Sequence, residues 1–511
     1  MSYLLGIDIG TSSTKTILFD TDGAAVASAV GEYPMYQPKN GWAEQEADDW
    51  WNATKASIGE VMAKSKINPR DIAGIGLSGQ MHGLVMLDGD SRPLRRSIIW
   101  CDQRTALECE QITSLVGAEK LIEITANPAL TGFTASKIMW VKNNEPEIYA
   151  KCRKILLPKD YIRFKLTGEF ATEVSDASGM QLLDVPNRRW SDYVADKLGI
   201  DIDMLGKVYE SPEITGTLTK EAAESCGLCE GIPVVGGAGD QAASAVGNGI
   251  VKPGAVSATI GTSGVVFAHL ENLAIDKLGR AHTFCHAVPG AWHVMGVTQG
   301  AGLSYKWFRD NFMTSEKYTA EQLGFDPNTL IDEIAETSPP GANGLVYLPY
   351  LMGERTPHLD ADCRGVFFGL SAMHQKKDML RAVLEGVVFS LADCLGIIRE
   401  MGTNPGFVYA AGGGANSRLW RQMMADIMGI EIAVNTSTES GALGVAILAG
   451  VGTGVYGSVE EACNDIIKAK SSQLPDEKNR ALYAKLYELY GGLYTSLKQD
   501  FAKLAKINQG F

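Results

Sequence analysis

Short apolar runs alternate with longer amphipathic stretches along much of the chain. The first run, Tyr3 to Ile9, has the length of a buried strand, and a turn of small hydroxylated residues separates it from a second run, Thr16 to Phe19. Further apolar runs that predict strands span residues 24–32, 72–77, 233–237, 345–348 and 407–411. Longer stretches predict helices over residues 47–64, 377–400 and 476–507. Strands and helices that alternate in this way are typical of an α/β protein.

The turn after the first strand carries groups that suit a phosphate. Gly10 lets the backbone turn sharply and approach a ligand closely. Lys15 supplies a positive charge, and Asp8 stands at the end of the strand, where a carboxylate can face a metal ion. Three consecutive residues offer hydroxyls and backbone amides that can hold phosphate oxygens: Thr11, Ser12 and Ser13. An ordinary hairpin turn is the alternative interpretation of this stretch.

The same pattern returns about half a chain later. Residues 260–263 have the same sequence, Ile-Gly-Thr-Ser, as residues 9–12, and a short apolar run follows each copy. A repeat over such a distance suggests two copies of one structural unit. The copies differ at one position, since Asp8 corresponds to Thr259, so only the first copy carries a carboxylate. Two phosphate-holding hairpins that face each other, one with an acid on its metal side, predict a site for a nucleoside triphosphate.

Composition narrows the class of protein. The chain has 511 residues, which is too long for one hydrophobic core and predicts two domains, residues 1–250 and 251–511. Its formal net charge of −14 argues against a nucleic-acid binder and against a basic membrane surface. Nine scattered cysteines fit a reducing cytoplasm, and no apolar run has membrane-spanning length. We therefore expect a cytoplasmic protein that binds neither nucleic acid nor membrane, with a homodimer as an open alternative.

Two more predicted strands deliver polar residues to their carboxyl ends, the edge at which open α/β sheets bind ligands. The strand at 72–77 is followed by Gln80, Met81 and His82. The strand at 233–237 is followed by Asp240 and Gln241. The structural alternatives are a core histidine at His82 and an acidic helix cap at Asp240. Helices of small residues at 242–247 and 441–449, one in each half, are expected to cross at a hinge between the domains.

The second half holds further candidate regions. A triple glycine, residues 412–414, follows a predicted strand and precedes Asn416, Ser417 and a helix. This order suits a nucleotide base and sugar that lie over the backbone. The polar loop Gly353 to His358 looks exposed, and loops of this kind often carry function. Residues 282–293 hold three of the seven histidines in what we expect to be a turn-rich region.

These motifs resemble, in order, those of the FGGY family of carbohydrate kinases, from Gly6 to about Gly450. Residues 8–15 are similar to the family's first phosphate motif, residues 261–264 to its second, and residues 412–417 to its adenosine motif. Two family signature regions are recognisable at 132–144 and 365–385. The resemblance implies the actin-like ATPase fold of the sugar kinase/hsp70 superfamily: two RNase-H-like α/β domains with a nucleotide cleft between them.

The resemblance also implies transfer of the ATP γ-phosphoryl group to a sugar hydroxyl, with ATP and Mg²⁺ as cofactors and a small sugar as partner. Met81-His82 is similar to the substrate motif of members that act on D-xylulose, whereas Gln241 resembles the glycerol-kinase pattern. Kinases of the same family that act on ribulose, glycerol or a related polyol therefore stay open. An actin-like ATPase without a sugar substrate is the alternative from another class.

The site roles that the resemblance implies fall into three groups. Asp240 is expected to act as the general base, and Asp8 to take part in catalysis by holding Mg²⁺. The residues expected to bind the sugar are Met81, His82, Asp240 and Gln241. The residues expected to hold the phosphates are Thr11, Ser12, Ser13, Lys15, Gly261 and Thr262, and those expected to line the adenosine site are Gly413, Gly414, Asn416 and Ser417.

Overall fold

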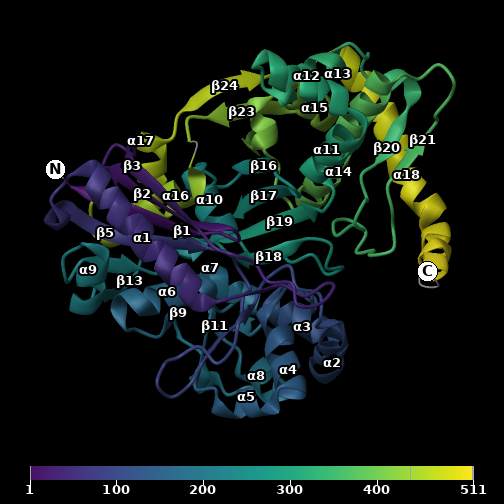
Figure 1. The fold of residues 1–511 in the computed structure, drawn as a ribbon. Coiled ribbons are helices and arrows are strands. Elements are labelled where there is room, and N and C mark those ends of the chain that lie inside the picture. Colours follow the sequence, from purple (N-terminus) through teal and green to yellow (C-terminus); the bar gives the residue numbers. More distant parts are fainter. Residues whose placement is uncertain (1, 438, 509–511) are drawn as a thin grey trace.

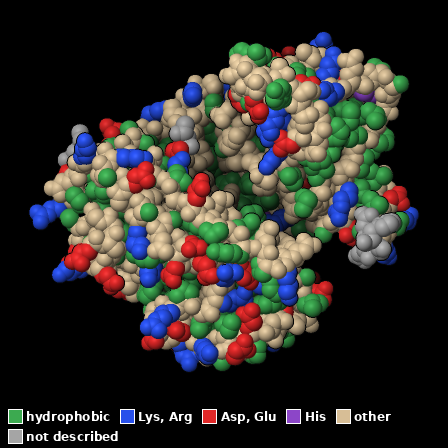
Figure 2. All heavy atoms as spheres, viewed as in Figure 1, with side chains coloured by type: hydrophobic (Ala, Val, Ile, Leu, Met, Phe, Trp, Pro, Cys, Tyr) green, Lys and Arg blue, Asp and Glu red, His purple; other side chains and the backbone are tan. Residues whose placement is uncertain are grey.

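Two seven-stranded sheets form the framework of the protein, one in each half of the chain (Figure 1). The computed structural model describes residues 2–437 and 439–508. Both sheets mix parallel and antiparallel strands, and helices flank them. A deep hollow opens on the molecular face between the two halves (Figure 2). The predicted two-domain α/β fold with a cleft is therefore confirmed.

The first sheet is centred on β1 (Tyr3–Ile9), which pairs antiparallel with β2 (Ser13–Asp20) and parallel with β5 (Ile72–Gly79). The remaining strands extend the sheet on both sides: β3 (Ala25–Glu32) beyond β2, and β14 (Pro233–Val235) and β13 (Ile214–Thr217) beyond β5, with β15 (Ala238–Gly239) also paired to β5. The strand β1 is buried along most of its length, as its continuous apolar sequence predicts.

The second sheet repeats this arrangement around β16 (Val256–Ile260), which pairs antiparallel with β17 (Gly264–Leu270) and parallel with β22 (Phe407–Gly412). The outer strands are β19 (Trp292–Thr298) and β18 (His282–Cys285) on one side, and β23 (Glu431–Asn435) and β24 (Ala469–Gln473) on the other. In both sheets the strand before the Ile-Gly-Thr-Ser turn is therefore central. The repeat read from the sequence corresponds to a repeat in structure.

Two helices of small residues pack against each other between the halves, as predicted. They are α10 (Asp240–Gly247) and α16 (Ser440–Gly452). A methyl group on Gly247 would overlap the backbone carbonyl of Ser440, and a methyl group on Gly444 would overlap that of Ala243. Helix α16 also lies directly on the first sheet, because a methyl group on Gly6 would overlap the carbonyl of Ala442. Only glycine permits backbones to approach this closely.

Long helices complete the second half. Helix α14 (Lys376–Glu400) is buried along most of its length, and the tail forms α18 (Glu477–Asn508) as its apolar spacing predicts. The tyrosines of α18 serve as packing residues, since Tyr483 and Tyr490 are buried in one cluster with Phe389 of α14. In the first half, α4 (Thr134–Asn144) lies at the bottom of Figure 1, and Phe133 occupies its N-cap position.

The expectation of a turn-rich region at residues 282–293 is right only for residues 286–291, which form the turn between two strands. These strands, β18 and β19, pair antiparallel at the edge of the second sheet. The three histidines of this region, His282, His286 and His293, are all buried. Because polar residues occupy inward positions, the strands lack the apolar alternation that identifies a half-buried strand in a sequence.

Candidate active site

Three adjacent strands of the first sheet run parallel, end at the same edge, and each delivers a candidate residue there. Asp8 of β1 is opposite Ser78 of β5, and Ser78 is opposite Ala238 of β15. Gln80 directly follows β5, and Asp240 directly follows β15. The sheet therefore brings together residues that are far apart in the sequence, at the edge where α/β sheets bind ligands.

The surroundings of the Asp8 carboxylate fit a cation. Its Oδ1 atom is buried and has no hydrogen-bond partner among the residues that the structure describes. Burial raises the pKa of Asp8, while the Ser78 hydroxyl and the charge of Lys15 lower it. A methyl group on Gly441, at the start of α16, would lie 3.1 Å from Asp8 Oδ2, so the backbone leaves little room on that side. A buried carboxylate oxygen without a hydrogen-bond partner suits Mg²⁺, bound directly or through water.

No cluster of three or more His, Cys, Asp or Glu side chains within residues 2–437 and 439–508 could hold a metal ion. Mg²⁺ characteristically keeps several waters and is bound by one or two carboxylates together with substrate phosphates. A single buried carboxylate is therefore sufficient from the protein's side.

Asp240 is the first residue of α10, and Gly239 occupies the N-cap position before it. Burial and then the negative charge of Asp8 raise the pKa of Asp240 to about 7, while the backbone and side chain of Gln241 lower it. A carboxyl group that titrates near neutrality can exchange a proton at physiological pH. These surroundings favour a chemical role over that of a helix cap, which the position of Gly239 already excludes.

Met81 and His82 follow Gln80, and Met81 lies beside the residue before Asp240. A methyl group on Gly239, the residue before Asp240, would lie 2.9 Å from Met81 Cγ, so the methionine packs on this backbone. The His82 backbone has φ of 70°, a left-handed conformation that is uncommon for a residue with a side chain. Unusual backbone conformations of this kind concentrate at binding sites.

The environment of His82 fixes both its backbone and its ring. Its carbonyl oxygen accepts hydrogen bonds from Thr134 Oγ1 and Lys137 Nζ, each at 3.1 Å. Its Nδ1 atom lies 2.9 Å from the carbonyl oxygen of Gly179. Burial and then the charge of Lys137 lower the pKa of His82 to about 3, so the ring is neutral at physiological pH. The Nδ1 atom therefore carries the hydrogen that it donates to Gly179.

The first hairpin is tight, as predicted, and its groups are in part already engaged. The Gly10 N–H donates to the Ser13 carbonyl at 3.0 Å, and Thr11 Oγ1 accepts from Trp100 Nε1 at 3.0 Å. Lys15 Nζ lies 2.6 Å from Glu439 Oε2, directly before α16, so this ion pair joins the two halves of the chain. Ser12 is exposed at the tip of the turn.

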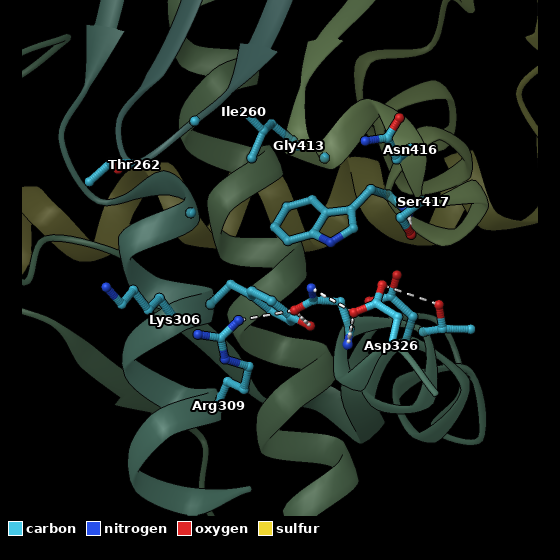
Figure 3. Close-up of a pocket in the computed structure, with 16 residues that line it drawn as sticks. Ile260, Thr262, Lys306, Arg309, Asp326, Gly413, Asn416 and Ser417 are labelled. Atoms are coloured by element: carbon cyan, nitrogen blue, oxygen red, sulfur yellow. Dashed lines mark hydrogen bonds between the residues drawn. The ribbon is translucent and has the colours of Figure 1, made fainter. Parts of the chain in front are cut away.

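The second hairpin and the triple-glycine segment line one cavity of roughly 440 Å³. It brings together the residues that the sequence assigned to the second phosphate site and to adenosine: Gly261, Thr262, Gly413, Gly414, Asn416 and Ser417. Figure 3 shows Lys306 and Arg309 across the cavity from Asn416 and Ser417. The four residues assigned to the first phosphate site lie outside its lining: Thr11, Ser12, Ser13 and Lys15.

Known proteins are similar to this chain in both sequence and architecture. The N-terminal domain model of the FGGY family of carbohydrate kinases matches residues 3–247, and its C-terminal domain model matches residues 256–453. The chain is 39% identical to the xylulose kinase of Bacillus subtilis (strain 168) over 498 residues, 98% of each chain. It is 34% identical to the gluconokinase of Bacillus licheniformis over 506 residues, 99% of this chain and 98% of that protein.

The chain belongs to the FGGY family of carbohydrate kinases. The crystal structure of a ligand-bound xylulose kinase from Lactobacillus acidophilus matches the fold of this FGGY kinase with a TM-score of 0.92, at 29% identity, over 99% of this chain and 100% of that one. The protein is accordingly an ATP-dependent sugar phosphotransferase, and the alternative of an actin-like ATPase without a sugar substrate is set aside. Among the described residues, no helix is both long enough and apolar enough to span a membrane.

Several residues that line the cavity at the second hairpin were not singled out by the sequence analysis. They come from α11 (Ala301–Phe312), α13 (Pro327–Glu336) and α15 (Arg418–Met428): Tyr305, Arg309, Asn328, Asp332 and Trp420. Asn328 Oδ1 accepts hydrogen bonds from Tyr305 Oη at 3.2 Å and Arg309 Nη1 at 3.1 Å (Figure 3). Polar residues on amphipathic helices are typical of solvated faces, so no local signal marks these as ligand contacts.

Proposed function

We propose that this kinase transfers the γ-phosphoryl group of ATP to the terminal hydroxyl of D-xylulose and forms D-xylulose 5-phosphate. The supporting observation is the position of Asp240, which has a pKa near neutrality and lies at the sheet edge next to Met81 and Asp8. The choice of sugar is supported by relatives named xylulose kinase that match nearly the full chain.

In the proposed reaction Asp240 is the general base. Its ionised carboxylate takes the proton of the C5 hydroxyl while that oxygen forms a bond to the γ-phosphorus in line with the leaving group. The bond between the γ-phosphorus and the bridging oxygen breaks, and ADP leaves with that electron pair. The proton stays on Asp240 until it is released to solvent, which a pKa of about 7 permits at neutral pH.

Asp8 is proposed to hold Mg²⁺, because its buried Oδ1 atom has no protein partner among the described residues. When bound, the cation supplies neutralisation of negative charge on the nucleotide phosphates. The proposed phosphate contacts come from both hairpins: Thr11, Ser12, Ser13 and Lys15 in the first, and Gly261 and Thr262 in the second. Lys15 would then pair with a phosphate oxygen in place of the Glu439 carboxylate.

The proposed adenosine contacts are Gly413, Gly414, Asn416 and Ser417, which already line one cavity. The proposed sugar contacts are Met81, His82 and Gln241, together with Asp240. The held backbone of His82 supports this assignment, since a fixed ring presents a hydrogen-bonding group in a constant position. The domain limits 1–250 and 251–511 remain a prediction, as α16 from the second part packs on the first sheet.

A coupled assay of ADP release over a panel of acceptors tests the proposal. The panel contains D-xylulose, D-ribulose, glycerol and D-gluconate, the last because a gluconokinase is also similar to the chain. We expect the highest kcat/KM with D-xylulose. A higher value with gluconate or glycerol would show that the sugar assignment is wrong while the kinase assignment holds.

A further inference from the structure

The polar loop Gly353 to His358 is firmly attached to the end of β19 by the residues on both sides of Arg355. The Glu354 carboxylate accepts a hydrogen bond from Thr298 Oγ1 at 2.6 Å and another from the Gln299 N–H at 2.9 Å. The Thr356 N–H donates to the Val297 carbonyl at 2.9 Å, and Thr356 Oγ1 accepts from the Val297 N–H at 3.0 Å. The backbone of Arg355 is therefore held in place from both directions.

From this position the Arg355 side chain reaches Gly132, in the other half of the chain. A methyl group on Gly132 would lie 4.0 Å from Arg355 Nη2. The positive charge of Arg355 also contributes to the lowered pKa values of His82 and His282. Gly132 and His82 are themselves linked, because Lys137 Nζ donates to the carbonyl oxygens of both. The guanidinium therefore lies beside the residues that hold His82.

The Arg355 guanidinium makes no hydrogen bond or ion pair with another group in the part of the chain that the structure describes. Arg355 is partly exposed, so its guanidinium can be reached from outside the protein. The arginines with little exposed side chain differ from it, since each has a carboxylate within hydrogen-bond distance: Arg95, Arg104, Arg163, Arg188 and Arg381. The N–H donors of the Arg355 guanidinium are therefore available to a ligand.

We propose that Arg355 binds the end of the sugar that is not phosphorylated, and that it recognises the ketose carbonyl there. The inference rests on the proposed function. Different ends of the site are assigned to the two groups from their neighbours, because Arg355 Nη2 lies beside Gly132, whereas Asp240 directly follows Gly239, which packs against Met81. With the C5 hydroxyl at Asp240, the opposite end of D-xylulose carries the C2 carbonyl and the C1 hydroxyl.

The chemistry of the two groups is complementary. A guanidinium offers only donors, in a planar fork, and it remains charged at all physiological pH values. A ketone oxygen offers only acceptors, whereas an alcohol in its place is both donor and acceptor and is less well matched. Because Arg355 comes from the second half and His82 from the first, a sugar bound to both would also join the two halves.

Titration calorimetry with the full-length protein tests this assignment. The ligands are D-xylulose and xylitol, in which an alcohol replaces the carbonyl. The variants are Arg355→Met, which keeps the length of the side chain but removes its charge, and Arg355→Lys, which keeps the charge but loses the fork. Arg364→Met is the matched control, since Arg364 lies on the same segment and donates to the carbonyls of Ala361 and Cys363.

We expect Arg355→Met to weaken D-xylulose binding about 10- to 100-fold, the loss expected when a charged hydrogen bond to a buried acceptor is removed. Xylitol and ATP affinities should change little, Arg355→Lys should fall between Arg355→Met and the wild type, and Arg364→Met should match the wild type. Equal weakening of ketose and polyol, or unchanged ketose binding, would overturn the assignment. Circular dichroism and retained ATP affinity check that each variant is folded.

The acceptor panel separates this proposal from the proposed function. If the wild-type enzyme prefers another sugar, the D-xylulose assignment fails by that result alone. Arg355 is then tested with the preferred sugar, and an unchanged KM for that sugar in Arg355→Met would remove Arg355 from the site. If the wild-type enzyme prefers gluconate, recognition of a ketose carbonyl is overturned.

Discussion

The carboxylates of Asp8 and Asp240 interact across the end of the first sheet, and the charge of Asp8 helps to raise the pKa of Asp240 to about 7. Asp8 belongs to β1 and Asp240 directly follows β15, and both strands pair with β5. When two carboxylates share a site, the negative charge of one raises the pKa of the other, so the two groups lose their protons at different pH values. One acid is therefore suited to a cation and the other to a proton, which is the division of roles proposed above.

Replacing Asp240 with asparagine should abolish most of the turnover. The amide keeps the shape and a hydrogen bond but cannot take up the proton, and general-base help is worth about 10²–10⁴-fold. We expect kcat to fall at least about 100-fold, while calorimetry shows ATP affinity within a few-fold and a modest loss of sugar affinity. Near-wild-type turnover would rule Asp240 out as the base, and lost ATP binding would instead assign it to the metal site.

The pH dependence of kcat/KM for the sugar should report the ionisation of Asp240. The base must be deprotonated to act, so activity should rise with pH up to a pKa of about 7 and then level off. Below that value the rate should fall about tenfold for each pH unit. A profile that is flat between pH 6 and pH 8 would contradict the assignment, provided that circular dichroism shows the protein folded throughout.

His82 should affect the sugar and not the nucleotide. We expect His82→Ala to raise KM for the ketose about 5- to 100-fold, since a lost polar contact leaves its partner unpaired. Because His82 has a left-handed backbone, His82→Asn serves as a second variant that tolerates this conformation. Steady-state kinetics with both substrates varied measure the effect, and equal changes in KM for sugar and ATP would indicate a structural role.

The close crossing of α10 and α16 should tolerate no side chain. In Gly444→Val the new atoms would meet the carbonyl of Ala243, and the overlap should lower the free energy of unfolding by about 2 kcal/mol or more. Gly396→Ala is the matched control, because Gly396 lies inside helix α14 with no atom within 4 Å of an added methyl group. That change should stabilise the protein by about 0.5–1 kcal/mol. Thermal unfolding of both variants measures the difference, and equal midpoints would contradict the close contact.

Buried histidines of the second sheet should make the protein sensitive to acid. Burial is the main cause that lowers the pKa of His293 to about 3 and that of His269 to about 4, against 6.5 in an unfolded chain. Below pH 6.5 the unfolded chain therefore binds protons that the folded protein excludes, and stability falls as the pH falls toward 4. At pH 5 the loss is about 2 kcal/mol for His293.

The variant His293→Phe tests the contribution of His293 to this pH dependence. Phenylalanine suits the position because Phe267 already stacks on the His293 ring, with centroids 4.3 Å apart. The variant should lose less stability than the wild type between pH 7 and pH 5 in denaturant unfolding. The control is His374→Phe, the same substitution at a partly exposed histidine before α14. An identical pH dependence in all three proteins would show that His293 does not contribute.

Local sequence was sufficient for the two hairpins and for β1, whereas the single strand predicted at 233–237 is divided into β14 and β15 in the structure. The Ile-Gly-Thr-Ser turns lie at the end of β1 and of β16, and Asp240 directly follows β15. These features depend on runs of a few residues, in which the apolar pattern of a buried strand and the residue types of a turn can be recognised from the sequence alone. The β18 and β19 strands were missed because buried histidines interrupt the apolar pattern that marks a strand.

The sequence by itself determined the family, the repeated unit and the residue types available for chemistry, because motifs and periodicity are local properties. Only the tertiary structure decided which residues meet. The pKa of Asp240 depends on Asp8 from another strand, Lys15 pairs with Glu439, and Arg355 reaches the segment that holds His82. The cavity proposed to bind the nucleotide likewise combines residues of α11, α13 and α15. Contacts between distant segments follow from sheet register and helix packing, which no single stretch of sequence specifies.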